Sequence, residues 1–358
     1  MKNLLIGIDF SKKKFDVAAI LADNLSVCAT ETHDEFSNDK KGVRMLLSWA
    51  KGLQKKHKAA ELLFCGENTG NYSRCAADNI YISGCDMWLA NPLKIKRSNP
   101  LRRGKSDKAD ALMIAEYAMR HYDERRLYEP PSKSVSDLRE MYGLRQFYVD
   151  RRKEVVVRNN EKQRTLESSA SQKMMDELSK QEIAELDWKI RRVSQQIREL
   201  IRSDEEIRET HDIVTSVPGI STLTAVCLIV YTNNFKSFDY DARRLASYFG
   251  VAPFGKESGS SVRSAPHVSC YCDKRIKAAL HEPALAAIRF NANMNTYYRR
   301  LTNRGKHHLV ALNNVKSKLL HIVVALVRDK KKYDPNYQNP LVACVKDTSH
   351  EKSVDFAW

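Results

Sequence analysis

Four acidic residues in this sequence are spaced as the ligands of a metal site would be. Asp9 ends one apolar, strand-like run and Glu67 ends a second, while Asp107 and Asp110 lie three residues apart at the head of a predicted helix. Residues three apart share one helix face, so these two carboxylates can act together. Carboxylate oxygens are ligands that Mg²⁺ and Mn²⁺ prefer, and such ions stabilise the attacking and leaving oxygens of phosphoryl transfer. The four acids therefore predict a divalent-metal site for phosphodiester chemistry.

The overall charge supports a nucleic-acid partner for that site. The 358 residues include 60 Lys and Arg against 44 Asp and Glu, which gives a formal charge of +16. A chain this basic favours a polyanionic partner. A basic run directly before the acid pair, interrupted by Pro92 and Pro100, predicts a loop that grips a phosphate backbone, although such runs are often only solvated surface. The residues of this run are Lys94, Lys96, Arg97, Arg102, Arg103 and Lys105.

A second series of basic residues continues into the region after residue 130. It could follow a duplex or a structured RNA, or it could be ordinary solvated helix charge. The series consists of Arg139, Arg145, Arg151, Arg152 and Arg158.

Several classes of protein are disfavoured by what the sequence lacks. The eight cysteines form no Cys-x-x-Cys pair, and no matching Cys or His pair completes a zinc site with Cys270 and Cys272. The N-terminus has no secretory pattern, and we expect no apolar run of membrane-spanning length. These features predict a cytoplasmic protein with reduced thiols that has no membrane partner.

The first 128 residues predict an α/β domain with a mixed sheet. Apolar runs at 4–10, 15–21 and about 25–30 indicate an antiparallel hairpin and a third strand. Further along, strands at 62–66 and 86–90 alternate with helical patterns. Those helices are expected at 39–57, 72–83 and 106–121, the last with Ser106 as N-cap.

The remainder predicts a helical spacer and a mostly α-helical domain. Pro130-Pro131 marks a boundary, and residues 129–208 carry an apolar seam that predicts either an intramolecular helical hairpin or a dimeric coiled coil. The seam residues are Ile183, Leu186, Ile190, Val193, Ile197 and Leu200. A domain over 209–328 follows, with helices at 222–231, 241–250, 273–290 and 308–327, a Ser- and Gly-rich loop at 255–265, and a tail over 329–358.

Several of these motifs together resemble the IS110 family of insertion-sequence transposases. They are Gly7-Ile8-Asp9-Phe10-Ser11, Glu67, Lys105-Ser106-Asp107-Lys108-Ala109-Asp110-Ala111, Ser216-Val217-Pro218-Gly219-Ile220, and Gly250-Val251-Ala252-Pro253 followed by Ser258-Gly259. The motifs occur in the family's order, and the resemblance spans most of residues 4–327. It implies a RuvC-like, ribonuclease-H-type N-terminal domain with an Asp-Glu-Asp-Asp tetrad and a C-terminal transposase domain with a nucleophilic serine.

The same resemblance implies a reaction and its partners. Ser258 is expected to attack a DNA phosphodiester and form a phosphoserine link, assisted by Mg²⁺ (or Mn²⁺) on Asp9, Glu67, Asp107 and Asp110. The neighbouring cations Lys256 and Arg263 are expected to aid it. A structured guide RNA is expected to pair with target and donor DNA, with the protein working as a homodimer or homotetramer at the nucleoid of a bacterium or archaeon.

Three other interpretations stay open at this point. A metal-dependent nuclease or Holliday-junction resolvase would use the tetrad and water without Ser258. An ATPase related to actin or sugar kinases also begins with a run such as Ile6-Gly7-Ile8-Asp9, but those proteins place small polar residues or glycines after the aspartate, where this chain has Ser11-Lys12-Lys13-Lys14. A non-catalytic nucleic-acid-binding protein would keep the charge but need none of the acids.

Overall fold

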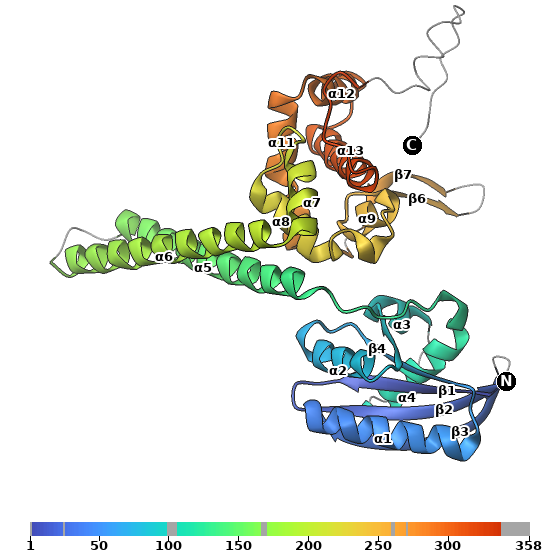
Figure 1. Cartoon of the computed structure of the whole chain (residues 1–358). Helices are drawn as coiled ribbons and strands as arrows, with labels where there is room; N and C mark the ends of the chain where they lie inside the picture. The colour runs from blue at the N-terminus through green and yellow to red at the C-terminus, as the bar shows by residue number, and fades with distance from the viewer. Residues whose placement is uncertain are drawn as a thin grey trace, which may run out of the picture. The chain divides into compact units, whose positions relative to one another are not determined.

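The computed structural model describes residues 2–23, 26–98, 106–165, 170–258, 262–269 and 271–337. The chain divides into two compact units, residues 1–130 and 131–358 (Figure 1). The finer division of the second unit into a spacer, a C-terminal domain and a tail stays a prediction.

The first unit is built on a five-stranded mixed sheet in the order β3-β2-β1-β4-β5. Strands β1, β2 and β3 form an antiparallel meander, and β4 and β5 continue it parallel to β1. This topology is of the ribonuclease-H type, so the predicted fold class is confirmed. The strands are β1 (Lys2–Phe10), β2 (Lys14–Asp23), β3 (Ser26–Ser37), β4 (Glu61–Glu67) and β5 (Asp86–Ala90).

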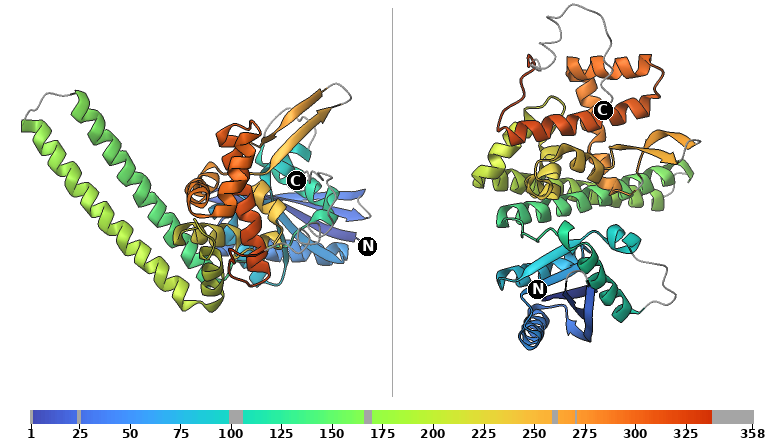
Figure 2. Two further views of the ribbon diagram at one scale, coloured as in Figure 1. Left: turned by 90° about the horizontal axis from the view of Figure 1, so that it is seen from above. Right: turned by 90° about the vertical axis from the view of Figure 1, so that its right-hand side faces the viewer.

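Helices cover both faces of this sheet because its central strand is apolar on both sides. Alternate residues of β1 point to opposite faces, so Leu4, Ile6 and Ile8 pack with α1 and α2, whereas Leu5 packs on the side of α4. Figure 2 shows α1 and α4 on opposite faces. The helices of this unit are α1 (Lys40–His57), α2 (Asn71–Ile82), α3 (Pro92–Ser98) and α4 (Asp107–Arg120).

Helix α3 lies where the sequence predicted a loop. Pro92 is its first residue, a position at which the missing N–H of proline has no helical partner to lose. The side chain of Asn91 accepts a hydrogen bond from the Leu93 N–H at 2.8 Å and so starts the helix. Pro92 therefore begins a helix instead of interrupting a loop.

The second unit begins with a long antiparallel hairpin of α5 (Lys133–Thr165) and α6 (Ala170–Ser203), as Figures 1 and 2 show. The predicted apolar seam lies on α6, where Leu186, Val193 and Ile197 are buried. The C-terminal half of the seam packs with α5 and α8 in one apolar cluster. The seam therefore serves the intramolecular hairpin, one of the two predicted alternatives.

The rest of the second unit is mostly helical around the last helix, α13. Gly219, at a φ of +99°, turns the chain between α7 and α8, and a Cβ there would lie 2.7 Å from the Ala287 nitrogen of α11. The helices are α7 (Glu205–Thr215), α8 (Thr222–Thr232), α9 (Ala242–Tyr248), α10 (Lys274–Ala279), α11 (His281–Phe290), α12 (Ala292–Asn303) and α13 (His308–Arg328). One helix was predicted over 273–290, but the structure divides it at Leu280, just before Pro283 in the first turn of α11.

By length and composition, α13 is apolar enough to cross a membrane, contrary to the expectation that the chain has no such run. Half of its apolar stretch is buried within the unit. Leu312, Val315, Leu319 and Val323 belong to the main apolar cluster there. This packing is that of a core helix.

Residues 255–265, predicted as a loop, lie within two strands and the segment between them. The structure forms a two-stranded antiparallel sheet from β6 (Pro253–Ser258) and β7 (Val262–Val268). Serine, glycine and charged residues dominate this stretch, and they give no apolar alternation from which a strand could be predicted.

The close packing of α4 on β1 gives a stability prediction. A Cβ at Gly7 would lie 2.2 Å from the Ala111 carbonyl oxygen and 2.4 Å from the Ala115 nitrogen. We expect Gly7→Ala to lower the free energy of unfolding by about 2–3 kcal/mol, as overpacking does, in urea denaturation followed by circular dichroism. Gly52→Ala is the matched control, since nothing lies within 4 Å of its Cβ position in α1; it should stabilise the chain by about 0.5–1 kcal/mol. Equal effects of the two substitutions would contradict this account of the packing.

Candidate active site

Two of the four predicted acids meet at one edge of the sheet because their strands are parallel neighbours. Ile8 of β1 pairs with Gly66 of β4, so the next residues along, Asp9 and Glu67, stand side by side at the carboxyl ends of the strands. On the other side of β1, Asp9 is paired with Asp16 of β2. Strand register alone thus gathers three carboxylates.

The other two acids come from the first turn of α4. Ser106 caps this helix by accepting a hydrogen bond from the Ala109 N–H at 3.2 Å, and Asp107 and Asp110 follow. The helix can approach β1 closely because Gly7 has no side chain and faces Ala111 and Ala115. Since Gly7 and Asp9 share one face of the strand, the contact brings the start of α4 to Asp9.

The electrostatics of Asp9 reflect this convergence. Burial, followed by the charges of Asp110, Glu67, Asp107 and Asp16, raises the pKa of Asp9 from 3.8 to about 6. Each of those negative charges disfavours ionisation of Asp9, and a bound cation would have the opposite effect. The other three predicted acids, Glu67, Asp107 and Asp110, therefore lie near enough to Asp9 to act on its charge.

Two further residues near Asp9, Lys14 and Asp16, were not predicted as part of the site. Asp16 is buried, and its Oδ1 lies 3.0 Å from Nε2 of His33. The Lys14 ammonium lies 2.6 Å from Glu35, 3.6 Å from Asp16 and 3.9 Å from Asp107. Lys14 and Asp16 could have been found only from the register of the β1–β2 hairpin, because no local motif contains them.

The donor set fits a hard divalent cation. All four predicted ligands are carboxylates, and burial together with the charges of its acidic neighbours raises the pKa of Asp9. Among the residues described, no three His, Cys, Asp or Glu side chains are close enough to form a closed metal-binding group. The acids are thus assembled in one place but more openly than a finished coordination shell.

Ser258 lies on the second unit, at the end of β6, where its backbone pairs with Val262. Lys256 and Arg263 belong to the same hairpin, opposite Ser264 and Glu257 respectively. The side chains of these residues lie outside the described part of the structure, so the role of Ser258 and its two cations stays a prediction.

The predicted basic residues divide into several groups. Helix α3 exposes Lys94, Lys96 and Arg97, and the Lys94 ammonium lies 3.3 Å from the Glu124 carboxylate. The other three residues of this run, Arg102, Arg103 and Lys105, lie outside the described residues.

The second basic series lies on α5, where Arg139 donates a hydrogen bond to the Val230 carbonyl. Arg151 and Arg152 pair with Glu182 and Asp187 of α6. Two of the five arginines in this series, Arg151 and Arg152, are therefore paired with acids within the hairpin.

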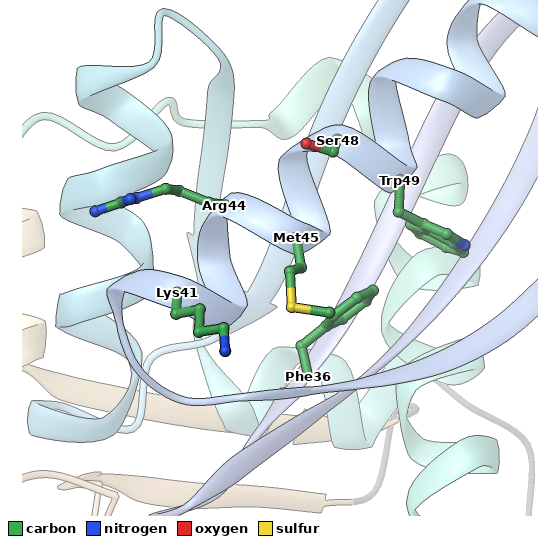
Figure 3. Close-up of a pocket in the computed structure, with 6 residues that line it drawn as sticks. All are labelled: Phe36, Lys41, Arg44, Met45, Ser48 and Trp49. Atoms are coloured by element: carbon green, nitrogen blue, oxygen red, sulfur yellow. The ribbon is translucent and has the colours of Figure 1, made fainter.

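A shallow apolar hollow of about 420 Å³ lies on α1 and β3 (Figure 3). Phe36 and Met45 face one another within it, and Lys41 and Arg44 line its rim. It has no acidic or nucleophilic group other than the Ser48 hydroxyl. Because α1 covers the face of the sheet opposite α4, the hollow is separate from the acids.

The burial of Asp9 and the carboxylates around it predict that Asp9→Asn stabilises the metal-free protein at neutral pH. With its pKa raised above the unfolded value, ionised Asp9 costs stability; this cost is absent below about pH 3 and is complete above about pH 6. After allowance for solvent screening, we expect a gain on the order of 1 kcal/mol at pH 7.5 in urea denaturation with a chelator.

Two controls make this test specific. The gain should shrink steadily as the pH of the measurement is lowered from 6 toward 4 and disappear near pH 3, where Asp9 is mostly protonated in both states. Asp150→Asn, at an exposed position of α5, should change stability by less than about 0.5 kcal/mol. A gain for Asp9→Asn that is independent of pH would contradict ionisation of Asp9 as the cause.

Comparison with known proteins agrees with this architecture. A family model described as a transposase of the DEDD IS110 type matches residues 6–167, and a model described as a transposase of the IS116/IS110/IS902 family matches residues 211–299. The chain is 26% identical over 341 residues to a pilin gene-inverting protein of Moraxella bovis, covering 93% of this chain and 98% of the relative. It is 32% identical over 145 residues to the 43.6 kDa protein of insertion element IS110 from Streptomyces coelicolor, covering 40% of this chain and 35% of that protein.

Among solved structures, RuvC of Thermus thermophilus in complex with a Holliday junction substrate matches with 11% identity and a TM-score of 0.27, over 35% of this chain and 99% of that one. The two family models match in the order in which the acids and the β6–β7 hairpin occur, and together they span more than half of the chain. The chain therefore belongs to the IS110 family of transposases and is a DNA recombinase.

Proposed function

We propose that this chain cuts and exchanges DNA strands through a covalent phosphoserine bond made by Ser258. The observation that carries the proposal is the convergence of Asp9, Glu67, Asp107 and Asp110 at one edge of the sheet in a strongly basic chain. Carboxylates so placed suit phosphodiester chemistry. The similarity to a protein named for gene inversion supports exchange over hydrolysis, because inversion requires strands to be rejoined as well as cut.

In the proposed reaction, the Ser258 oxygen attacks the phosphorus of a DNA phosphodiester. A serine–phosphorus bond forms as the bond from phosphorus to a sugar oxygen breaks; the hydroxyl proton leaves Ser258, and the departing oxygen gains one. A sugar hydroxyl of the exchanged strand then attacks the phosphoserine and releases Ser258. Because the phosphodiester energy is kept in the covalent link, rejoining needs no nucleotide cofactor.

The four carboxylates would hold Mg²⁺ (or Mn²⁺), which when bound polarises the phosphate and stabilises the departing oxygen. The residues themselves have two tasks. Asp9 and Glu67 fix the site to the rigid end of the sheet, and Asp107 and Asp110 come with the first turn of α4. Lys14, already 3.9 Å from Asp107, offsets part of the negative charge before a metal arrives.

The proposed partners are target and donor DNA, a structured guide RNA and further copies of this chain. The charge of +16 supports binding of both nucleic acids. A guide RNA would leave sequence choice to base pairing, as in other RNA-directed systems. A homodimer or homotetramer would supply several serines for an exchange that joins several strand ends. The relatives come from bacteria, which supports action in the cytoplasm at the nucleoid.

The serine is tested with Ser258→Ala. The full chain is incubated with Mg²⁺, donor and target plasmids and the RNA transcribed beside its gene; labelled DNA is then run on denaturing gels before and after protease treatment. Wild type should give protein-linked DNA and recombinant joints, and Ser258→Ala should give neither while its circular dichroism is unchanged.

Ser264→Ala, in the opposite strand of the hairpin, is the control and should retain both products. Protein-linked DNA in Ser258→Ala would refute the assignment, and nicks without joints in both proteins would favour the nuclease or resolvase alternative.

The metal is tested by thermal unfolding. At a Mg²⁺ concentration about 30 times its Kd, binding should stabilise the wild type by about 2 kcal/mol and raise its Tm by a few degrees. Asp110→Asn should lose this rise, and Asp150→Asn should keep it. A rise of equal size in Asp110→Asn would show that Mg²⁺ binds elsewhere.

A further inference from the structure

The exposed face of α6 around Trp188 differs from the rest of the helical hairpin. It forms a hollow of about 770 Å³. Four arginines contribute to its lining, three of them from α6 and one from α5. The principal residues of this surface, which we call the Trp188 groove, are Arg145, Trp188, Arg191, Arg192, Gln195 and Arg198.

Arg191, Arg192 and Arg198 of the Trp188 groove differ from their neighbours in having no acidic partner in the described part of the chain. Elsewhere in the hairpin, Arg151 and Arg152 pair with Glu182 and Asp187, and Lys189 lies 2.6 Å from Glu185. Among the described residues, no carboxylate lies within 4.0 Å of the guanidinium groups of Arg191, Arg192 or Arg198. Cations gathered without acids repel one another, so an anionic partner would be favoured there.

The fourth arginine is partly buried. Arg145 donates from Nε to the Ser194 hydroxyl at 2.9 Å, and burial lowers its pKa. Arginine stays charged in proteins nonetheless. The polar neighbour Gln195 donates a hydrogen bond to Glu199 at 3.0 Å, and Glu199 does not line the hollow. The groove thus presents fixed positive charge.

Trp188 adds a second kind of recognition. Its side chain is 60% exposed in the midst of these arginines. An indole face accepts stacked bases, and guanidinium groups bind phosphates or stack beside them. Bases can stack on a protein only where they are unpaired, as in the loops and bulges of a folded RNA, whereas a DNA duplex keeps its bases inside.

We propose that the Trp188 groove binds an unpaired loop of a structured RNA, with a base stacked on Trp188 and phosphates held by Arg191, Arg192 and Arg198. The proposal rests on the proposed function insofar as that function includes a guide RNA. It names where on the chain such an RNA is held.

Binding is tested on the full chain with a fluorescein-labelled RNA hairpin that has an unpaired loop of about eight nucleotides. A fully paired RNA duplex and a DNA duplex of the same length are the other probes, and polyglutamate is a competitor. Trp188→Ala should weaken binding of the looped hairpin by about tenfold or more and leave both duplexes unaffected; Trp188→Phe should retain most of the affinity. The looped RNA should also quench tryptophan emission in wild type and do so much less in Trp188→Phe.

The charge is tested by replacing Arg191, Arg192 and Arg198 with glutamine together. Each lost phosphate contact on a single strand lowers the salt dependence, so the plot of log affinity against log salt should become shallower by about 2. The matched control replaces Arg151, Arg152 and Lys189 with glutamine together, which removes the same net charge from ion-paired positions. This variant should change the slope by much less. Circular dichroism checks that both triple variants fold.

The outcomes separate this proposal from the proposed function. Equal losses for the looped hairpin and both duplexes in Trp188→Ala, or equal slopes in the two triple variants, would overturn the groove as an RNA site. Displacement of the hairpin by polyglutamate as efficiently as by unlabelled looped RNA would overturn it in favour of an acidic protein partner. Protein-linked DNA formed through Ser258 in the same preparations would leave the proposed reaction intact in each case.

Discussion

The contact between α4 and β1 at Gly7 is the constraint on which the acidic site depends. Without a Cβ on Gly7, the backbone of α4 comes close enough for the Ala111 oxygen to occupy that space. Asp9 and Glu67 are fixed by the sheet, but Asp107 and Asp110 are fixed only by where α4 lies. The geometry of the carboxylates is therefore set by a residue that has no side chain and takes no part in the chemistry.

That arrangement opposes stability. Burial and four neighbouring negative charges raise the pKa of Asp9 to about 6. The Lys14 ammonium offsets part of this negative charge through its contact with Asp107. A fold optimised for stability alone would replace one of these acids. Their retention in one place makes sense for a site that meets a cation, in the way that active sites often store unfavourable interactions.

Much of this could be predicted from the sequence, and the misses have physical reasons. The strands of the first unit and the cap of α4 at Ser106 depend on periodicity and neighbouring residues, so they were recognisable. Asp16 and Lys14 were missed because they join the site through strand pairing. The β6–β7 hairpin carries Ser258 but no apolar alternation, so it was predicted as a loop. For the basic series of α5 the sequence leaves two interpretations open, because only the structure shows that Arg151 and Arg152 have acids across the hairpin.

The position of α13 in the chain has a consequence for how the protein is made. This helix is the last one described, and its Leu312, Val315, Leu319 and Val323 complete the main core of the second unit. During synthesis, the surfaces of α7, α9 and α11 that contact α13 therefore stay exposed until residue 328 has left the ribosome. A chain interrupted before that point would expose apolar surface and be open to aggregation or proteolysis. The first unit has a core of its own, so this dependence on the last helix belongs to the second unit alone.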